Sequence, residues 1–207
     1  MSSQRSSMAR PLSTLFTGLL VFSGSALVAC GGDGHNHGDE NELITTVRLT
    51  LTPSTTGATL TGQWSDPDGD GGANPTITAP GPLARSSTYA LTLTVLNESV
   101  SPAEDITTEI KAEAEDHLFV FDGAAIAQNL VRIRYADKES DYGTNATGED
   151  LPVGVASTVV ARTAGTGALR IRLGHLPPVN GAPVKVANVS LEGRELDVDV
   201  TIPITVQ

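Results

Sequence analysis

The sequence predicts an all-β protein, an antiparallel β-sandwich of the immunoglobulin-like kind with one inserted α-helix. Seven stretches alternate apolar and polar residues with a period of two, which is typical of half-buried strands. Only 4% of the residues are aromatic, so the core is expected to consist of Val, Leu and Ile. The single Cys excludes a disulfide framework. A small barrel is the alternative architecture.

A strand is expected at each place along the chain where this alternation of apolar and polar residues recurs. In the first, Val47, Leu49 and Leu51 alternate with polar residues, so one face is directed inward. The same pattern defines seven strands, at 47–51, 60–64, 89–95, 131–135, 155–159, 169–173 and 196–206, with two short additional strands at 118–121 and 184–190. Because Pro203 has no N–H to donate, the last strand is expected at a sheet edge or where the ladder is open.

A helix is predicted over 102–116, where the period changes from two to four. Ser101 is the expected N-cap, Pro102 occupies the first helical position and Glu104 the first turn. Three apolar residues follow at four-residue spacing, Ile106, Ile110 and Ala114. The helix should therefore pack one apolar stripe against the sheet.

The N-terminus is typical of a secreted bacterial lipoprotein. Residues 1–11 carry two arginines and no acid, and residues 12–28 are uncharged and mostly apolar or small. The stretch ends in LVAC at 27–30, which resembles the lipobox in which the cysteine is lipidated after cleavage. We therefore expect a signal peptide over 1–29 and a lipid anchor on Cys30. An ordinary signal peptide that happens to end near a cysteine is the alternative.

The remaining chain is expected to form a tether followed by one domain. Residues 30–42 include no large apolar side chain and should be a disordered acidic, His-containing tether, and 43–207 should form the single β-sandwich domain. The predicted location is the bacterial cell envelope, with the membrane as partner through the N-terminal lipid. Glycine after the cysteine is compatible with the outer membrane, at its periplasmic or surface face.

The order of several motifs resembles a family of small bacterial lipoproteins that often carry the automatic label of type 1 periplasmic binding fold superfamily. The motifs are ENELITTV (40–47), WSDPDGDGG (64–72), TY (88–89), LNES (96–99), EDITTEI (104–110), EAEDH (113–117) and LGH (173–175). The resemblance extends from the lipobox to the C-terminus and implies a lipoprotein without an established activity. The labelled fold is α/β, whereas the alternation here predicts strands with a single helix.

Charge and motifs exclude several classes of function. The net charge of −11 argues against a nucleic-acid partner, since phosphate binding needs clustered Lys and Arg. Signatures of zinc proteases, serine hydrolases and phosphate loops are missing. The GTG sequence at 165–167 lacks the third glycine of a dinucleotide-binding loop and is interpreted as a hairpin turn. We therefore expect a non-enzymatic protein.

A first candidate metal site is the acidic loop after the second strand. Asp66, Asp68 and Asp70 alternate before a glycine at the sixth position, which resembles the first half of a calcium-binding EF-hand loop. The twelfth position is Ile77 rather than the bidentate Glu, and no helices flank the loop. A plain polar turn between two strands is the alternative.

A second candidate site involves the two histidines of the predicted domain. His117 is expected at the end of the helix with Glu113 one turn before it, and His175 at the end of a strand. If the two ends meet, two imidazoles and a carboxylate could hold Zn²⁺ or Cu²⁺. Otherwise His117 is a cation that favours the helix C-terminus and His175 an ordinary loop residue.

The tether offers a third set of metal ligands, His35 and His37, beside several acids. A disordered site would pay the entropy of ordering and bind weakly. A hydrophilic linker without a ligand is the alternative interpretation.

Two strands carry arginine pairs on their polar faces, Arg132 with Arg134 and Arg170 with Arg172, and the last strand carries acids. Cross-strand ion pairs are the expected use of these charges, and a basic patch for an acidic partner is the alternative. The sequence thus favours a lipid-anchored binding protein whose ligand is a metal ion or a neighbouring envelope protein. A purely structural lipoprotein is the alternative.

Overall fold

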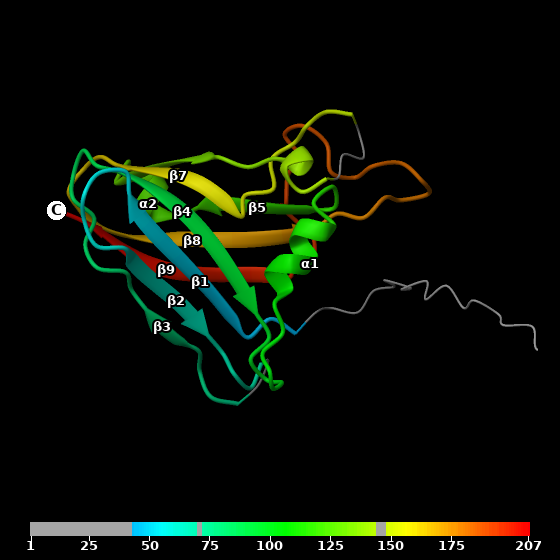
Figure 1. The fold of residues 1–207 in the computed structure, drawn as a ribbon, viewed down its shortest axis with the longest axis horizontal. Coiled ribbons are helices and arrows are strands. Elements are labelled where there is room, and N and C mark those ends of the chain that lie inside the picture. The colour runs from blue at the N-terminus through cyan, green and yellow to red at the C-terminus, as the bar shows by residue number, and fades with distance from the viewer. Residues whose placement is uncertain (1–42, 70–71, 144–147) are drawn as a thin grey trace, which may run out of the picture. The chain divides into compact units, whose positions relative to one another are not determined.

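Two antiparallel sheets form a β-sandwich in the computed structural model, which describes residues 43–69, 72–143 and 148–207 (Figure 1). The six-stranded sheet has the order β3-β2-β1-β4-β7-β6 and the three-stranded sheet the order β5-β8-β9. The strands are β1 (Thr46–Pro53), β2 (Leu60–Ser65), β3 (Thr76–Thr78), β4 (Thr88–Leu96), β5 (His117–Asp122), β6 (Val131–Tyr135), β7 (Ala156–Ala161), β8 (Gly165–His175) and β9 (Val198–Val206). The predicted sandwich is confirmed.

The core lies between the two sheets and consists mainly of aliphatic side chains. On β1, Val47, Leu49 and Leu51 are buried as the alternation predicts. They stand opposite Val95, Leu93 and Leu91 of β4, so each cross-strand pair contributes to one apolar layer. From the other sheet, Ile171 of β8 and Ile202 of β9 close the core.

The β8–β9 pairing corrects one sequence interpretation. Residues 165–167 do not form a hairpin turn, because they begin β8 and pair with Val206, Thr205 and Ile204. A Cβ on Gly167 would approach the backbone nitrogen of Ala125 to 3.0 Å, so glycine lets the neighbouring helical segment pack closely. Pro203 lies on β9, an edge strand as predicted.

The predicted helix exists but is shorter than 102–116. Helix α1 spans Ile106–Ala112 and its N-cap is Asp105, whose carboxylate accepts from the backbone N–H of Thr107. The prediction of Ser101 as cap is wrong, because Ser101 lies in a bent loop closed by an isolated β-bridge between residues 97 and 104. Inside α1, the buried Thr107 hydroxyl accepts from the N–H of Val95 and donates to its carbonyl, which fixes the helix to β4.

Two further short elements and one strand were not predicted. A four-residue helix, α2, spans Ala124–Ala127 and packs on β8, and a 3₁₀ turn, η1, spans Glu139–Asp141. Strand β3 has three exposed residues, so it carries no apolar alternation to detect. Elements this short are fixed by their neighbours and leave little periodicity in the sequence.

The connection between β8 and β9, residues 176–197, forms no strand, which makes the prediction of a strand at 184–190 wrong. Its apolar residues instead join a second, smaller cluster around Leu118, Leu176 and Leu191. Lys185 is buried in the same connection and forms an ion pair with Glu139 of η1. The connection is therefore held in place by its buried side chains rather than by the ladder of hydrogen bonds that pairs two strands.

The residues that the structure describes all belong to one unit. Within the described residues, no helix has the length and hydropathy needed to cross a bilayer.

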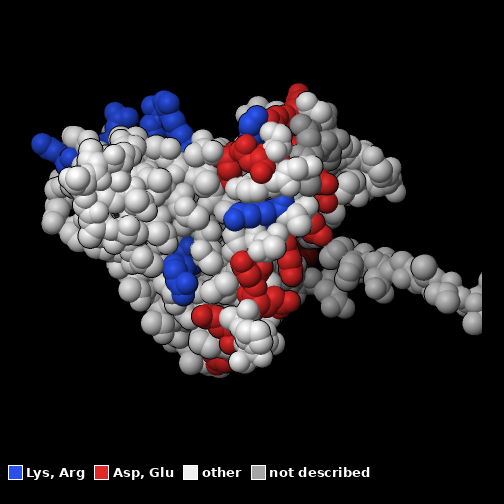
Figure 2. Space-filling view, viewed as in Figure 1, with Lys and Arg blue, Asp and Glu red and all other residues white. Residues whose placement is uncertain are grey.

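The charged groups are distributed unevenly over the surface. Figure 2 shows acidic groups gathered around α1, while basic groups at the opposite end of the same face have no acidic neighbours. The expected pairing holds for one arginine pair, because Arg170 binds Asp199 and Arg172 binds Asp122 and Glu192.

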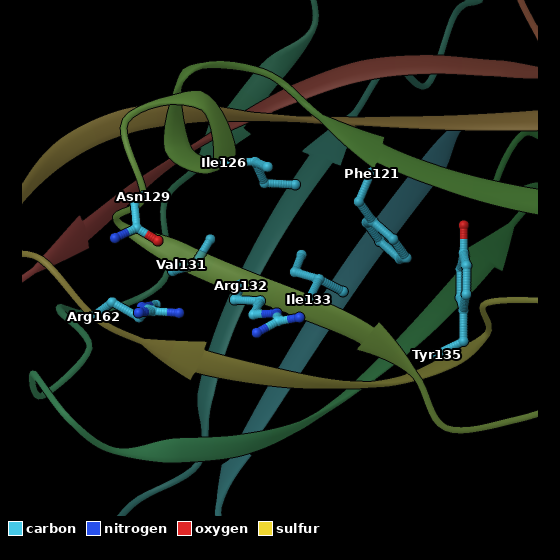
Figure 3. Close-up of a pocket in the computed structure, with 8 residues that line it drawn as sticks. All are labelled: Phe121, Ile126, Asn129, Val131, Arg132, Ile133, Tyr135 and Arg162. Carbon is cyan, nitrogen blue, oxygen red and sulfur yellow. The ribbon is translucent and has the colours of Figure 1, made fainter.

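The other arginine pair does not follow this expectation. Arg132 and Arg134 of β6 are exposed and form no ion pair with any residue that the structure describes. A pocket of about 430 Å³ lies beside them, at the side of the sandwich where β5 and β6 are both edge strands (Figure 3).

Candidate metal centre

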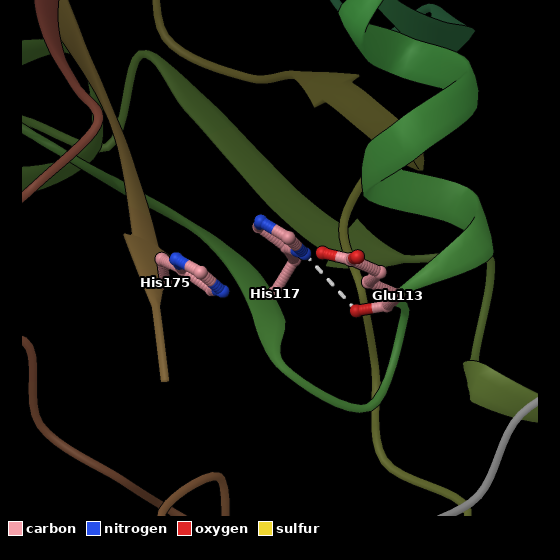
Figure 4. A group of neighbouring side chains, drawn as sticks. All are labelled: Glu113, His117 and His175. Carbon is pink, nitrogen blue, oxygen red and sulfur yellow. Dashed lines mark hydrogen bonds between the residues drawn. The ribbon is translucent and has the colours of Figure 1, made fainter. Parts of the chain in front are cut away.

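Two histidines that are far apart in sequence meet at the end of the three-stranded sheet. His117, the first residue of β5, stands directly opposite His175, the last residue of β8. Their rings are stacked with centroids 4.6 Å apart and planes 1° from parallel. One potential ligand atom each from Glu113, His117 and His175 lie within 4.8 Å of one another (Figure 4). Elsewhere in the described chain, no other set of three such residues converges in this way.

The structure reaches this convergence by a different local route from the one expected. Helix α1 ends at Ala112, with Glu113 as its C-cap, so His117 lies on β5 and not on the helix. A tight turn, closed by the N–H of Asp116 donating to the Glu113 carbonyl, brings the carboxylate back beside the strand. Glu113 therefore reaches His117 across a turn rather than along a helix face.

The ring of His117 is buried and fixed by one hydrogen bond. Its Nδ1 donates to the backbone carbonyl of Glu113 at 3.0 Å. Burial lowers the pKa of His117 to about 4, although the Glu113 carbonyl opposes this shift. The ring is thus neutral at physiological pH, which is the form that binds metal ions. The expectation that His117 serves as a cation at the helix end is therefore wrong.

This hydrogen bond restricts how His117 can bind a metal ion. With Nδ1 protonated, the free lone pair lies on Nε2. Coordination through Nε2 preserves the bond to Glu113 and resembles the arrangement in which a metal-binding histidine donates its other N–H to a carbonyl. Coordination through Nδ1 would require the ring to give up this bond.

Two further carboxylates lie close enough to His175 to interact with its charge. Burial, with the charge of Glu115, raises the pKa of Asp116 to about 6, and the positive charge of His175 opposes this rise. Burial also raises the pKa of Asp197, again opposed by His175. A divalent cation beside His175 would favour the charged form of both groups.

The side chains are close together but are not yet in a coordination geometry. A nitrogen lone pair lies in its ring plane, so two parallel rings cannot direct their lone pairs at one ion. Ligand atoms on a tetrahedral Zn²⁺ also lie roughly 3.3 Å apart, given metal–nitrogen bonds of about 2 Å. Binding therefore requires one ring to turn, and His175, which is exposed, is free to do so whereas His117 is packed.

In the described part of the acidic loop, the aspartates are arranged as in a polar turn rather than as in an ion-binding loop. Asp66 is buried, and its backbone N–H donates to the Thr45 carbonyl at 2.8 Å. Asp68 accepts from the N–H of Ala73 at 2.8 Å, which closes a turn with its own carboxylate. This arrangement fits the polar-turn alternative. Asp70, the third predicted calcium ligand, lies outside the described residues, as do His35, His37 and Cys30.

Sequence reasoning found the three converging residues but missed Asp116 and Lys185. Asp116 adjoins His117 and could have been proposed from that position alone. Lys185 donates from its Nζ to the Ala114 carbonyl at 2.5 Å and so supports the turn that carries Glu113. Its segment has no periodicity, and nothing in the sequence indicates that this lysine is buried.

No protein-family model, curated protein or solved structure shows significant similarity to the chain.

Proposed function

We propose that this protein binds a divalent transition-metal ion through His117, His175 and Glu113, and that it does so without catalysing a reaction. The observation that carries the proposal is the direct pairing of the two histidines beside Glu113. Three ligand-bearing side chains lie within 4.8 Å of one another, two from the turn into β5 and one from the end of β8. The burial of His117 keeps it neutral and therefore available to a metal.

The donor set favours Zn²⁺ or Cu²⁺ over Ca²⁺. Imidazole nitrogens suit zinc and copper, whereas calcium takes six to eight oxygen ligands. Three protein ligands leave one tetrahedral position for water or a further carboxylate. Asp116 and Asp197 are candidates for that position, since the charge of His175 acts on both carboxyl groups.

The proposed location is the bacterial cell envelope, with the domain attached through lipidated Cys30. The LVAC sequence at 27–30 supports this part of the proposal, as does the uncharged segment before it. Labelled palmitate should enter the wild-type protein and fail to enter Cys30→Ser in the expressing bacterium. Equal labelling of both proteins would refute the anchor without affecting the metal site.

Calorimetric titration of the purified full chain with Zn²⁺ tests the metal site. Because His35 and His37 add a separate metal-binding possibility, the titration is carried out on the His35→Ala/His37→Ala protein. This protein should bind about one equivalent, and the further change His175→Ala should abolish binding. His175 is exposed, so its replacement should leave the fold intact.

A stability measurement separates the domain site from the tether. An ion that binds only the folded state adds about 2.7 kcal/mol at a hundredfold excess over Kd. Zn²⁺ should therefore raise the free energy of unfolding of the His35→Ala/His37→Ala protein, and not that of the protein that also carries His175→Ala. If Zn²⁺ binds neither protein, the structural-lipoprotein alternative replaces this proposal.

A further inference from the structure

A second candidate site is the pocket between the edge strands β5 and β6, which is separate from the histidine pair. Its volume of about 430 Å³ falls within the range of small-molecule sites in proteins. The two sheets are not joined by a ladder on this side, because β6 pairs only with β7 and β5 only with β8. The sandwich is therefore open here, and a ligand can approach the core from this side.

The pocket has an apolar part beside its polar rim. Phe121 and Ile126 form one side, and Ile133 faces them from β6 (Figure 3). One end is closed by Tyr135, whose ring lies 6.2 Å from that of Phe121. The Tyr135 hydroxyl donates to the backbone carbonyl of Phe119 at 2.8 Å, which links β6 to β5 and holds this end in place.

The rim of the same pocket carries two arginines, Arg132 and Arg162. Both are exposed, and neither has an ion pair or a side-chain hydrogen bond with any residue in the described parts of the chain. In Figure 3 both arginines lie on the side of β6 that is away from Ile126. The chain has 24 acidic residues against 13 basic ones, so two unneutralised guanidinium groups at one pocket are a notable exception to its overall charge.

The two arginines of β8, which are half-buried or buried, differ from Arg132 and Arg162 because acidic neighbours neutralise them. Arg170 is bidentate to Asp199, with both nitrogen–oxygen distances at 2.6 Å. Arg172 contacts Asp122 and Glu192. A guanidinium group can donate two parallel hydrogen bonds to the two oxygens of a carboxylate or phosphate. Arg132 and Arg162 are therefore available to bind an oxyanion of a ligand in this way.

We propose that this pocket binds a small amphipathic anion, an apolar body that ends in a single carboxylate or phosphate group. The apolar body would lie between Ile126 and Ile133, and the oxyanion would bind Arg132 and Arg162 at the rim, with the Asn129 amide as a further donor. The site shares no residue with the proposed metal centre. Its success or failure is therefore independent of metal binding.

Calorimetric titration with octanoate and with octyl phosphate tests the site in the purified full chain. Acetate supplies the charge without the apolar body, and 1-octanol supplies the body without the charge. The test variant is Arg132→Gln/Arg162→Gln. Arg134→Gln is the matched control, because Arg134 is also exposed and unpaired within the described chain and lies on β6, but does not line the pocket.

At least one of the two amphipathic anions should bind saturably, and both acetate and 1-octanol should bind at least about tenfold more weakly, equivalent to about 1.4 kcal/mol. The double variant should lose at least tenfold in affinity and Arg134→Gln should lose little. The anion that binds more tightly identifies the head group. The proposal is overturned if neither anion binds, if 1-octanol binds as tightly as the better anion, or if Arg134→Gln weakens binding as much as the double variant does.

Discussion

Lys185 and Glu139 form an ion pair in which both side chains are about 1% exposed, with Nζ 3.0 Å from Oε1. Burial lowers the pKa of Lys185, and the hydrogen bond and charge of Glu139 oppose that shift. Lys185 also donates to the Ala114 carbonyl, so one ammonium group joins the β8–β9 connection to η1 and to the turn after α1. The pair therefore supports the same end of the domain as the histidines.

Removing one partner of this pair should destabilise the domain strongly. Lys185→Met leaves the Glu139 carboxylate buried without its cation, and such losses cost about 3–5 kcal/mol. Chemical unfolding of the purified protein measures the effect. The double variant Lys185→Met/Glu139→Leu should recover most of the loss, because no charge is then left buried. Equal stability of Lys185→Met and the wild type would show that the pair is not buried in solution.

The N-cap of α1 provides a prediction with a matched control. Asp105→Ala removes the acceptor for the Thr107 N–H and for the Thr108 hydroxyl and should lower the free energy of unfolding by about 1 kcal/mol. Ser101→Ala removes a hydroxyl from an exposed residue outside the helix and should have almost no effect. A loss for Ser101→Ala as large as that for Asp105→Ala would mean that the helix begins earlier than Asp105.

The buried His117 should make stability depend on pH. Its pKa is about 4 in the folded protein against an ordinary value of 6.5, so the unfolded chain takes up the proton first as pH falls. The stabilisation is therefore complete above about pH 6.5 and is lost progressively toward pH 4, by at most about 3 kcal/mol at 1.36 kcal/mol per unit. Asp116 acts in the opposite direction, because its raised pKa of about 6 favours the folded state as pH falls from 6 to 4.

The informative quantity is consequently the difference between wild type and His117→Gln, in which the Asp116 contribution largely cancels. Measured by chemical unfolding in the presence of a chelator, the stability of wild type relative to the variant should decrease between pH 6.5 and pH 4. A difference that stays constant across this range would contradict the buried, neutral state of His117.

The fold could be predicted because a half-buried strand requires apolar and polar residues to alternate in the sequence. Leu91, Leu93 and Val95 alternate with polar residues and are all buried on β4. This alternation does not predict the structure correctly where tertiary contacts determine it. Residues 184–190 contain alternating apolar residues but pack as an irregular connection, held partly by buried Lys185. The start of α1 was also misplaced, because Pro102 suggests a first helical turn but precedes an isolated bridge.

The candidate site was predictable in composition and not in geometry. Glu113, His117 and His175 could be proposed together because each lies at the end of a predicted element. The register that places His117 opposite His175 depends on the pairing of β5 with β8, which the sequence does not specify. The rim arginine Arg162 lies in a connection and carries no motif, so the pocket it lines emerged only from the structure.

The most direct test of the metal centre is NMR of the imidazole nitrogens during a Zn²⁺ titration. The chain has four histidines, so His35→Ala/His37→Ala leaves only His117 and His175 to observe. We predict that one nitrogen of each ring shifts at about one equivalent of Zn²⁺, with both rings titrating together. Ring nitrogen signals of His117 and His175 that remain unchanged through a molar excess of Zn²⁺ would contradict the proposed function.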